Sequence, residues 1–405
     1  MTGRTMASAR IAIVGGGIGG LAAAAFLARA GLPSTVYEQA ASVGEVGAGL
    51  VVAPNAARAL RKIGAMEELS LRAVRLDIGW EFRRWEDGKV LSWEDLSSSC
   101  ERLYGEQTYT AHRADLLRAI EGCVPQTAIE LGHKCIGIDA CHGGMRLEFA
   151  DGQWTEADIV VGADGIHSVV RSALFGPASA TYSGMCAFRS LVPAHRAPVL
   201  ARRSAQTLWI GPDHHLVHYP VSAGEQVNLV GFAPAGSYTA ESWSATATVE
   251  EFLAEFKGWD PRLTGLIRAS GTPGRWALLD REPLERWSEG STTLLGDAAH
   301  PMFPFFAQGA AQAIEDAAVL ARCLADGISD PASALGRYEQ IRRPRTTKLQ
   351  MVSHARAQVN HLPDGPDQHR RDSAFGQQDP LLANGWIYGY DTDVAYDELR
   401  GASTG

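Results

Sequence analysis

The sequence predicts an α/β fold with two domains, one of which is built from separate pieces of the chain. Three short aliphatic segments, at 11–14, 158–162 and 292–295, are predicted to be buried parallel strands. Between them the chain alternates apolar and polar residues, a pattern typical of antiparallel sheet. A chain of 405 residues is also longer than one hydrophobic core usually supports. We therefore expect a discontinuous α/β domain interleaved with a β-sheet domain, followed by a C-terminal helical segment.

The expected domain boundaries follow the alternation of these two patterns. The α/β domain is expected to comprise residues 8–75, 105–180 and 275–350. The β-rich domain is expected to comprise residues 76–104 and 181–274, and the remainder, 351–405, is expected to form a C-terminal helix and tail.

The first forty residues predict a strand–helix–strand unit. Residues 11–14 are the first strand, and the segment "IGGLAAAAFLARAG" predicts a helix because it is rich in alanine and ends at Gly31. The segment "STVYEQA" predicts the second strand at 34–40. Further helices are predicted at 54–65 and 112–124.

Short strands dominate two later stretches, 75–104 and 180–235. A hairpin is predicted around the turn Asp151-Gly152, because Asp-Gly is a preferred two-residue turn. Two more helices are expected, at 249–258 and 310–325. The polar, proline-containing stretch 361–385 is expected to be a surface excursion.

Composition excludes several classes of function. The net charge of −9 and the lack of a basic run argue against a nucleic-acid partner. The six cysteines form no CxxC pair, so no metal site is expected, and scattered thiols favour a cytoplasmic location. The apolar run near the N-terminus is broken by glycines and is too short for a membrane helix.

The glycine cluster in "IAIVGGGIGG" fits the dinucleotide-binding fingerprint of a Rossmann-like domain. Gly15 permits the tight turn, Gly17 lets the backbone approach a pyrophosphate, and Gly20 lets the helix pack on the strand. Glu38 ends the second strand, where a carboxylate can accept hydrogen bonds from ribose hydroxyls. This fingerprint alone does not distinguish FAD from NAD.

Two later motifs distinguish between FAD and NAD. Asp164-Gly165 follows the strand at 158–162, and Gly296-Asp297 follows the strand at 292–295, before a proline and a helix that starts after Gln308-Gly309. In this order the three motifs resemble class A FAD-dependent monooxygenases, the para-hydroxybenzoate hydroxylase superfamily, over nearly the whole chain. The resemblance implies a GR2-type FAD-binding domain, with NADH or NADPH as a transient co-substrate and O2 as oxidant.

The resemblance also implies which residues bind FAD. Glu38 should hold the adenosine ribose, Arg113 should lie near the pyrophosphate, and Asp297 should bind the ribityl and pyrophosphate portion. The turn at Gln308 should face the flavin pyrimidine ring, where a helix N-terminus stabilises negative charge. The full expected set is Gly15, Gly17, Ile18, Gly20, Glu38, Gln39, Gly49, Arg113, Asp164, Asp297, Gln308, Gly309 and Ala310.

Within the superfamily, "WIGPDHHLVHYPV" and the segment around Asp297 resemble salicylate hydroxylases and 6-hydroxynicotinate 3-monooxygenases. This implies catalytic roles for His215 and Tyr219, which are four apart on a predicted strand and so share a face, and for the carbonyl of Pro301. His300 is expected to shape the loop. The expected substrate pocket comprises Arg189, Trp209, Phe305 and Phe306. Arg83, Arg84 and Arg189 remain alternatives for binding a substrate carboxylate.

The implied activity is hydroxylation of a small phenolic or hydroxy-(hetero)aromatic substrate through a flavin C4a-hydroperoxide, with loss of CO2 if the attacked carbon bears a carboxylate. The alternatives are a flavin epoxidase or N-hydroxylase acting on a non-phenolic substrate, and a non-catalytic flavin carrier. A tryptophan halogenase is disfavoured because "GWEFRR" is the nearest match to its motif. The sequence leaves a monomer or a homodimer open.

Overall fold

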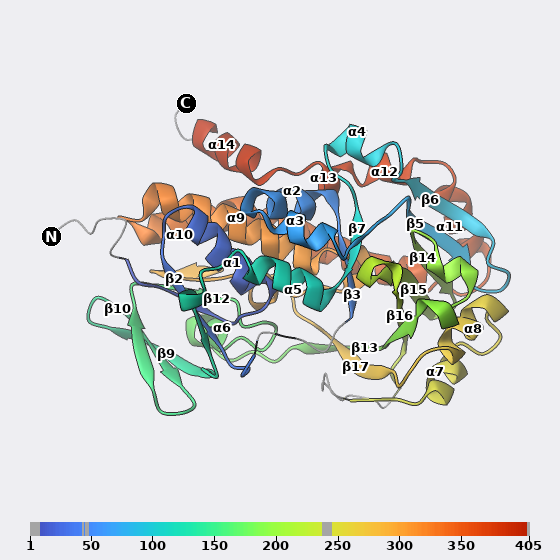
Figure 1. The fold of residues 1–405 in the computed structure, drawn as a ribbon, viewed down its shortest axis with the longest axis horizontal. Coiled ribbons are helices and arrows are strands. Elements are labelled where there is room, and N and C mark those ends of the chain that lie inside the picture. The colour runs from blue at the N-terminus through green and yellow to red at the C-terminus, as the bar shows by residue number, and fades with distance from the viewer. Residues whose placement is uncertain (1–8, 43, 45–47, 237–244, 403–405) are drawn as a thin grey trace.

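The computed structural model describes residues 9–42, 44, 48–236 and 245–402. Two domains lie side by side along the long axis, with the mixed α/β domain on the left and the β-rich domain on the right of Figure 1. The α/β fold class predicted from the sequence is confirmed.

The central sheet of the α/β domain joins segments that are far apart in the chain. Its strand order is β18 (Ser288–Glu289), β19 (Thr292–Leu294), β12 (Ile159–Gly162), β1 (Ile11–Val14), β2 (Ser34–Glu38) and β8 (Ile129–Leu131). All neighbouring pairs except β18–β19 are parallel. Every residue of β1 and β12 is buried, which explains their aliphatic composition without alternation. The three segments identified by motif therefore meet in one sheet.

Helices pack against this central sheet, and two of them lie close to each other. They are α1 (Ile18–Arg29), α2 (Pro54–Ile63), α3 (Ala65–Ser70), α5 (Arg113–Glu121), α6 (Val169–Phe175) and α9 (Gly309–Gly327). A Cβ at Gly19 on α1 would lie 2.6 Å from the Leu295 side chain and 3.3 Å from Ala313 Cβ on α9. Small residues thus let α1 and α9 approach each other closely above the glycine loop.

Two small sheets complete this domain. One has the order β3 (Gly49–Val52), β7 (Tyr109–His112) and β4 (Val74–Arg75). The other contains β9 (Cys135–Cys141), β10 (Gly144–Phe149) and β11 (Trp154–Ala157), with Gly152 at a φ of +86° in the predicted hairpin turn.

The β-rich domain is a seven-stranded sheet. Its order is β17 (Gly274–Asp280), β13 (Thr181–Pro193), β16 (Gln226–Pro234), β15 (His214–Val221), β14 (Ala205–Gly211), β5 (Ile78–Arg84) and β6 (Val90–Asp95). Phe252, Phe256 and Trp259 pack on one face, from α7 (Val249–Glu255), the following turn, and the loop before α8 (Pro261–Arg268). The face of the seven-stranded sheet that these aromatic residues leave uncovered can therefore pack against the α/β domain.

The structure differs from the predicted boundaries in two places. The sequence predicts that residues 275–350 belong to the α/β domain, but strand β17 belongs to the seven-stranded sheet. It pairs there with β13, where Trp276 lies opposite Ala187. The prediction missed this pairing because β13 is remote in sequence. Helix α10 (Pro331–Asn360) runs without interruption through the predicted boundary at 350, although it contains Pro344.

The C-terminal region is more helical than predicted. The stretch expected to be a surface excursion contains α11 (Pro366–Phe375) and α12 (Pro380–Ala383), and α13 (Gly385–Tyr388) and α14 (Thr392–Ala402) follow. One short helix, α4 (Cys100–Tyr104), lies near α12 in Figure 1. Among the described residues, the helices lack the combined length and hydropathy that a membrane span requires.

Candidate active site

The glycine loop between β1 and α1 requires glycine for steric reasons. Gly15 has a φ of +104°, and a Cβ there would lie 2.5 Å from the carbonyl oxygen of Ala163. A Cβ at Gly20 would lie only 1.9 Å from the carbonyl oxygen of Gly15. At Gly17, by contrast, a Cβ would meet nothing within 4 Å. The loop is therefore tightly packed at Gly15 and Gly20 and has free space at Gly17. Gly17 directly precedes the backbone amides at the start of α1, which begins at Ile18.

Glu38 stands at the end of β2, next to this loop. Its Oε2 accepts a hydrogen bond of 2.6 Å from the Gly16 amide, and its Oε1 accepts one of 2.8 Å from the Ala40 amide. Gln39 is exposed beside it. The acid is thus held where the fingerprint predicts an adenosine-binding carboxylate.

The second motif makes local contacts of its own. Asp164 Oδ1 accepts from the Ser168 hydroxyl at 2.6 Å, and its Oδ2 accepts from the amides of Val169 at 2.7 Å and Val170 at 3.2 Å. The carboxylate therefore satisfies amides at the start of α6. A direct cofactor contact for Asp164 stays a prediction.

The third motif places a carboxylate at an exposed position between buried residues. Asp297 is exposed, whereas residues 292–296 and 298–300 on either side of it are buried. The surrounding protein raises the pKa of Asp297 by desolvation, and electrostatic interactions with His300 and Arg113 oppose this rise. The Arg113 amide donates to the carbonyl oxygen of Ala48 at 2.9 Å, and burial lowers the pKa of the Arg113 guanidinium. Asp297 and Arg113 are thus brought together from distant segments.

The turn at Gln308 leads into α9. Ala307 has a left-handed φ of +51°, and Gln308 Oε1 accepts from Asn55 Nδ2 at 3.0 Å and from Gln312 Nε2 at 3.1 Å. Gly309 and Ala310 are the first residues of α9 and are half-buried. The amide-rich N-terminus of α9 is therefore fixed in orientation by neighbouring side chains.

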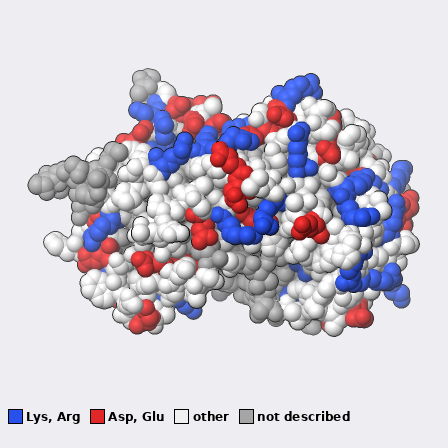
Figure 2. All heavy atoms as spheres, in the orientation of Figure 1, with Lys and Arg blue, Asp and Glu red and all other residues white. Residues whose placement is uncertain are grey.

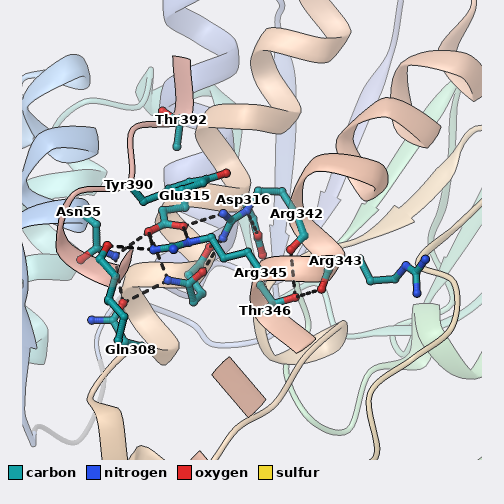
Figure 3. A network of polar contacts seen from close by, with 12 residues as sticks. Asn55, Gln308, Glu315, Asp316, Arg342, Arg343, Arg345, Thr346, Tyr390 and Thr392 are labelled. Carbon is teal, nitrogen blue, oxygen red and sulfur yellow. Dashed lines mark hydrogen bonds and ion pairs between the residues drawn. The ribbon is translucent and has the colours of Figure 1, made fainter. Parts of the chain in front are cut away.

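A buried ionic network that the sequence analysis missed supports this turn, as Figure 3 shows. Arg342 donates to Glu315 at 2.6 Å and to Asp316 at 2.7 Å, and Arg345 donates to Glu315 at 2.8 Å. Burial alone would raise the pKa of Glu315, but Arg345 and Arg342 hold it below its usual value. The only sequence signal was a pair of adjacent acids within an alanine-rich helix.

His300 belongs to the same network. Its Nε2 lies 2.5 Å from Asp316 Oδ2, and its ring packs against Trp287 with centroids 5.1 Å apart. Pro301, whose carbonyl is expected to contact the substrate, accepts a hydrogen bond of 2.9 Å from Gln350 Nε2 on α10. A carbonyl oxygen has a second lone pair, so a substrate contact of Pro301 stays a prediction.

Strand β15 carries His215 and Tyr219 on the sheet face that is opposite to α7 and α8. Their neighbours across the strands are Phe232 and Asn228 of β16, and Asn228 Oδ1 accepts from the Gly49 amide at 2.7 Å. A Cβ at Gly49 would lie 2.6 Å from Asn228 Cβ and 2.7 Å from Tyr219 Cε2. Gly49 therefore allows the two domains to touch at this point.

His215 is enclosed by aromatic rings. It stacks on Phe232 with centroids 4.3 Å apart, meets Phe305 edge-on at 5.0 Å, and its Nδ1 lies 2.6 Å from Nε2 of His361. Burial lowers the pKa of His215 well below 6.5 and that of His361 to about 4, so this pair is neutral at pH 7. The sequence analysis missed His361, which lies within the predicted surface excursion.

Two more cationic and aromatic groups share this face. Arg189 lies on β13 beside Trp276, with 4.2 Å from its guanidinium carbon to the ring centroid, and burial lowers its pKa to about 10. Burial raises the pKa of Tyr219, and the charge of Arg189 opposes that rise. Phe305 is buried against Phe232, while Phe306 is half-buried against Trp80.

Trp209, predicted to line the substrate pocket, lies on the opposite face. It is paired with Leu216, the neighbour of His215 in the strand, and its Nε1 donates to Nε2 of His218 at 3.1 Å. Its ring is fully buried in the core under α7 and α8. The assignment of Trp209 to the pocket is corrected, because adjacent strand residues alternate between the two faces.

The alternative arginines are already paired. Arg83 donates to Glu81 at 2.7 Å, and Arg84 donates to Glu86 at 2.7 Å and Asp364 at 2.9 Å. Arg189 lies on the same sheet face as Tyr219 and packs against Trp276. No group of residues suited to a metal ion occurs within the described ranges.

These features fit FAD. The glycine loop is open above Gly17, the Asp297 carboxylate is exposed within a buried run, and Asn228 Nδ2 is buried with no hydrogen-bond partner among the described residues. Figure 2 shows that both acidic and basic side chains occur on the face in view. The fold and site thus define a flavoprotein, and its expected cofactor-binding residues come from distant segments of the chain.

Comparison with known proteins identifies the family. The family model described as "FAD binding domain" matches residues 8–353. The chain is 42% identical over 382 residues to a 3-amino-4-hydroxybenzoate 2-monooxygenase of Streptomyces platensis, which covers 94% of this chain and 96% of that protein. It is 36% identical over 350 residues to a 6-hydroxynicotinate 3-monooxygenase of Pseudomonas fluorescens, covering 86% and 91%.

The solved structures agree. A salicylate hydroxylase substrate complex superposes with a TM-score of 0.81 at 26% identity, covering 97% of this chain and 98% of that one. This chain belongs to the FAD-binding domain family. It is an FAD-dependent aromatic monooxygenase that consumes NAD(P)H and O2, as the sequence motifs predicted.

Proposed function

We propose that this enzyme hydroxylates a small aromatic acid that carries a ring hydroxyl group. Its relatives named above act on 3-amino-4-hydroxybenzoate and on 6-hydroxynicotinate, both of which combine a ring hydroxyl with a carboxylate. The observation that carries the proposal is that Arg189, Tyr219 and His215 share one sheet face, where the domains meet at Gly49.

The cofactor residues are proposed to divide the FAD molecule between them. The glycine loop and Glu38 would hold the ADP half, and Arg113 and Asp297 the pyrophosphate and ribityl portion. The N-terminus of α9 at Gln308 would face the pyrimidine ring, where its amides stabilise negative charge. When bound, FAD supplies hydride acceptance from NAD(P)H and the activation of O2.

The remaining pocket residues would prepare the substrate. Tyr219 is proposed to hydrogen-bond the ring hydroxyl, and Arg189, a cation at neutral pH, to favour the phenolate form. His215 has its Nδ1 bonded to His361, so its Nε2 is proposed to take the hydroxyl proton. Phe232 and Phe305 would exclude water from the reacting ring.

The test is a panel of hydroxybenzoates and hydroxynicotinates, with 3-amino-4-hydroxybenzoate among them. We expect at least one hydroxy acid to accelerate NAD(P)H consumption and to yield a product that carries one atom from ¹⁸O2, seen by mass spectrometry. Parallel assays with NADH and NADPH identify the reductant. If no member of the panel is oxygenated, or if only alkenes or ring nitrogens are, the proposal is wrong.

We further infer a cytoplasmic enzyme that is a monomer or a homodimer. All six cysteines are free thiols, which supports a reducing compartment. Size-exclusion chromatography with light scattering would test the assembly, and a larger oligomer would contradict it.

A further inference from the structure

A cluster of aromatic rings surrounds one arginine on the last third of α10. The guanidinium carbon of Arg356 lies 4.9 Å from the ring centroid of Phe306, 5.6 Å from that of Phe82 and 5.8 Å from that of Trp80. Phe375 of α11 stacks on Phe82 with centroids 4.7 Å apart. We call Trp80, Phe82, Phe306 and Phe375 the aromatic cage.

The charge of Arg356 is not neutralised within the described part of the chain. No hydrogen bond or ion pair there reaches its guanidinium, whereas the nearby Arg84 contacts Glu86 and Asp364. The acid that acts on it electrostatically is Glu94. Burial raises the pKa of Glu94 to about 8, so this carboxyl is protonated at neutral pH.

Glu94 is also engaged elsewhere. Its Oε1 accepts from Asn384 Nδ2 at 2.7 Å, and the Tyr388 hydroxyl lies 3.3 Å from its Oε2. Burial lowers the pKa of Arg356, the expected response of a cation that lacks a close counter-ion. Aromatic faces attract a cation but do not cancel its charge. The cage therefore holds a positive charge that an anionic ligand would neutralise.

The cage lies on the same sheet face as the proposed active site. One row of directly opposite residues runs from Arg189 through Val230, Val217 and Leu208 to Phe82. Four strand intervals of about 4.8 Å put the two ends of this row roughly 19 Å apart at the backbone. Arg189 thus stands at one end and Arg356, over Phe82, at the other, with aliphatic side chains between them.

A small cavity lies between two cage residues, Trp80 and Phe306, and the Gln308 turn. It has a volume of about 10 Å³, the size of one water molecule, and its lining includes Trp80, Glu94, Phe306 and Gln308. The cage is therefore next to the turn proposed to face the flavin, and not on a remote surface.

We propose that Arg356 and the aromatic cage form the anion-binding subsite that holds the carboxylate of an aromatic acid. The planar guanidinium can donate two parallel hydrogen bonds to a carboxylate, while Phe306 and Trp80 offer apolar faces to the ring. This inference rests on the proposed function for its substrate class. Arg189, roughly 19 Å away at the backbone, then does not bind this carboxylate.

The test measures binding without turnover. Benzoate and benzamide have the same shape and differ in charge, so we would titrate both into the FAD-loaded enzyme by calorimetry, without NAD(P)H. Arg356→Met is expected to weaken benzoate binding at least tenfold and to leave benzamide binding unchanged. Arg356→Lys keeps the positive charge but loses the two parallel guanidinium donors. Its affinity for benzoate is expected to lie between that of the wild type and that of Arg356→Met. Arg84→Met, on a neighbouring arginine that is already ion-paired, is the matched control and should bind benzoate like the wild type.

Several outcomes would overturn the assignment. These are no benzoate binding by the wild type, wild-type binding by Arg356→Met, an equal loss for benzoate and benzamide, or a benzoate-selective loss in Arg189→Met alone. If Arg356→Met does not load FAD, the Arg356→Lys variant decides the same question. Benzoate binding through Arg356 in an enzyme that oxygenates no hydroxy acid would support the subsite and reject the proposed function.

Discussion

The buried carboxyl of Glu94 makes the stability of this protein depend on pH. Its side chain is 1% exposed, and burial raises its pKa from 4.5 to about 8. Because the unfolded chain releases this proton at a lower pH than the folded protein does, stability falls as the pH rises from 4.5 towards 8. A pKa change of this size corresponds to about 3 kcal/mol of unfolding free energy lost between pH 4 and pH 7.

Glutamine at position 94 would remove this dependence. Its amide oxygen can still accept from Asn384 and Tyr388, but it cannot ionise. For a chain of 405 residues, about 3 kcal/mol corresponds to a change of about 4 °C in Tm.

The assay is thermal unfolding of FAD-loaded wild type and Glu94→Gln at pH 5.0 and pH 7.5. We expect the Tm difference, variant minus wild type, to rise by several degrees between the two pH values. Equal pH dependence in the two proteins would refute the assigned ionisation state of Glu94.

Three further substitutions test the site. Gly20→Ala should prevent FAD loading, measured by absorbance at the flavin band, because its Cβ would clash with the Gly15 carbonyl oxygen; a normally yellow variant would contradict this. Arg342→Met should cost about 3–5 kcal/mol in urea unfolding, because Glu315 and Asp316 lose a buried partner, and a loss below about 1 kcal/mol would argue against the network. His361→Ala should lower kcat about 100-fold with benzoate binding unchanged if the pair with His215 moves the substrate proton, whereas unchanged kcat would exclude that role.

Local motifs in the sequence were sufficient to predict the strand ends and turns that carry the expected cofactor residues. The glycine loop, Glu38 and Asp297 depend on strand ends and turns whose backbone requirements are visible in a few consecutive residues. The substrate side was harder to predict. Trp209 and His215 both belong to paired strands of alternating residues, and the register of β14 against β15 determines which of them faces the pocket.

The sequence by itself determined the fold class, the FAD-binding family and the order of the motifs, because these depend on short-range backbone geometry and apolar periodicity. Only the tertiary structure decided which charged side chains are paired. Arg342 pairs with Glu315, and His215 with His361, between segments 27 or more residues apart. Arg356 has no ion pair with an acid among the residues that the structure describes. Such partners are set by how sheets and helices pack, and a single sequence carries no periodic signal for them.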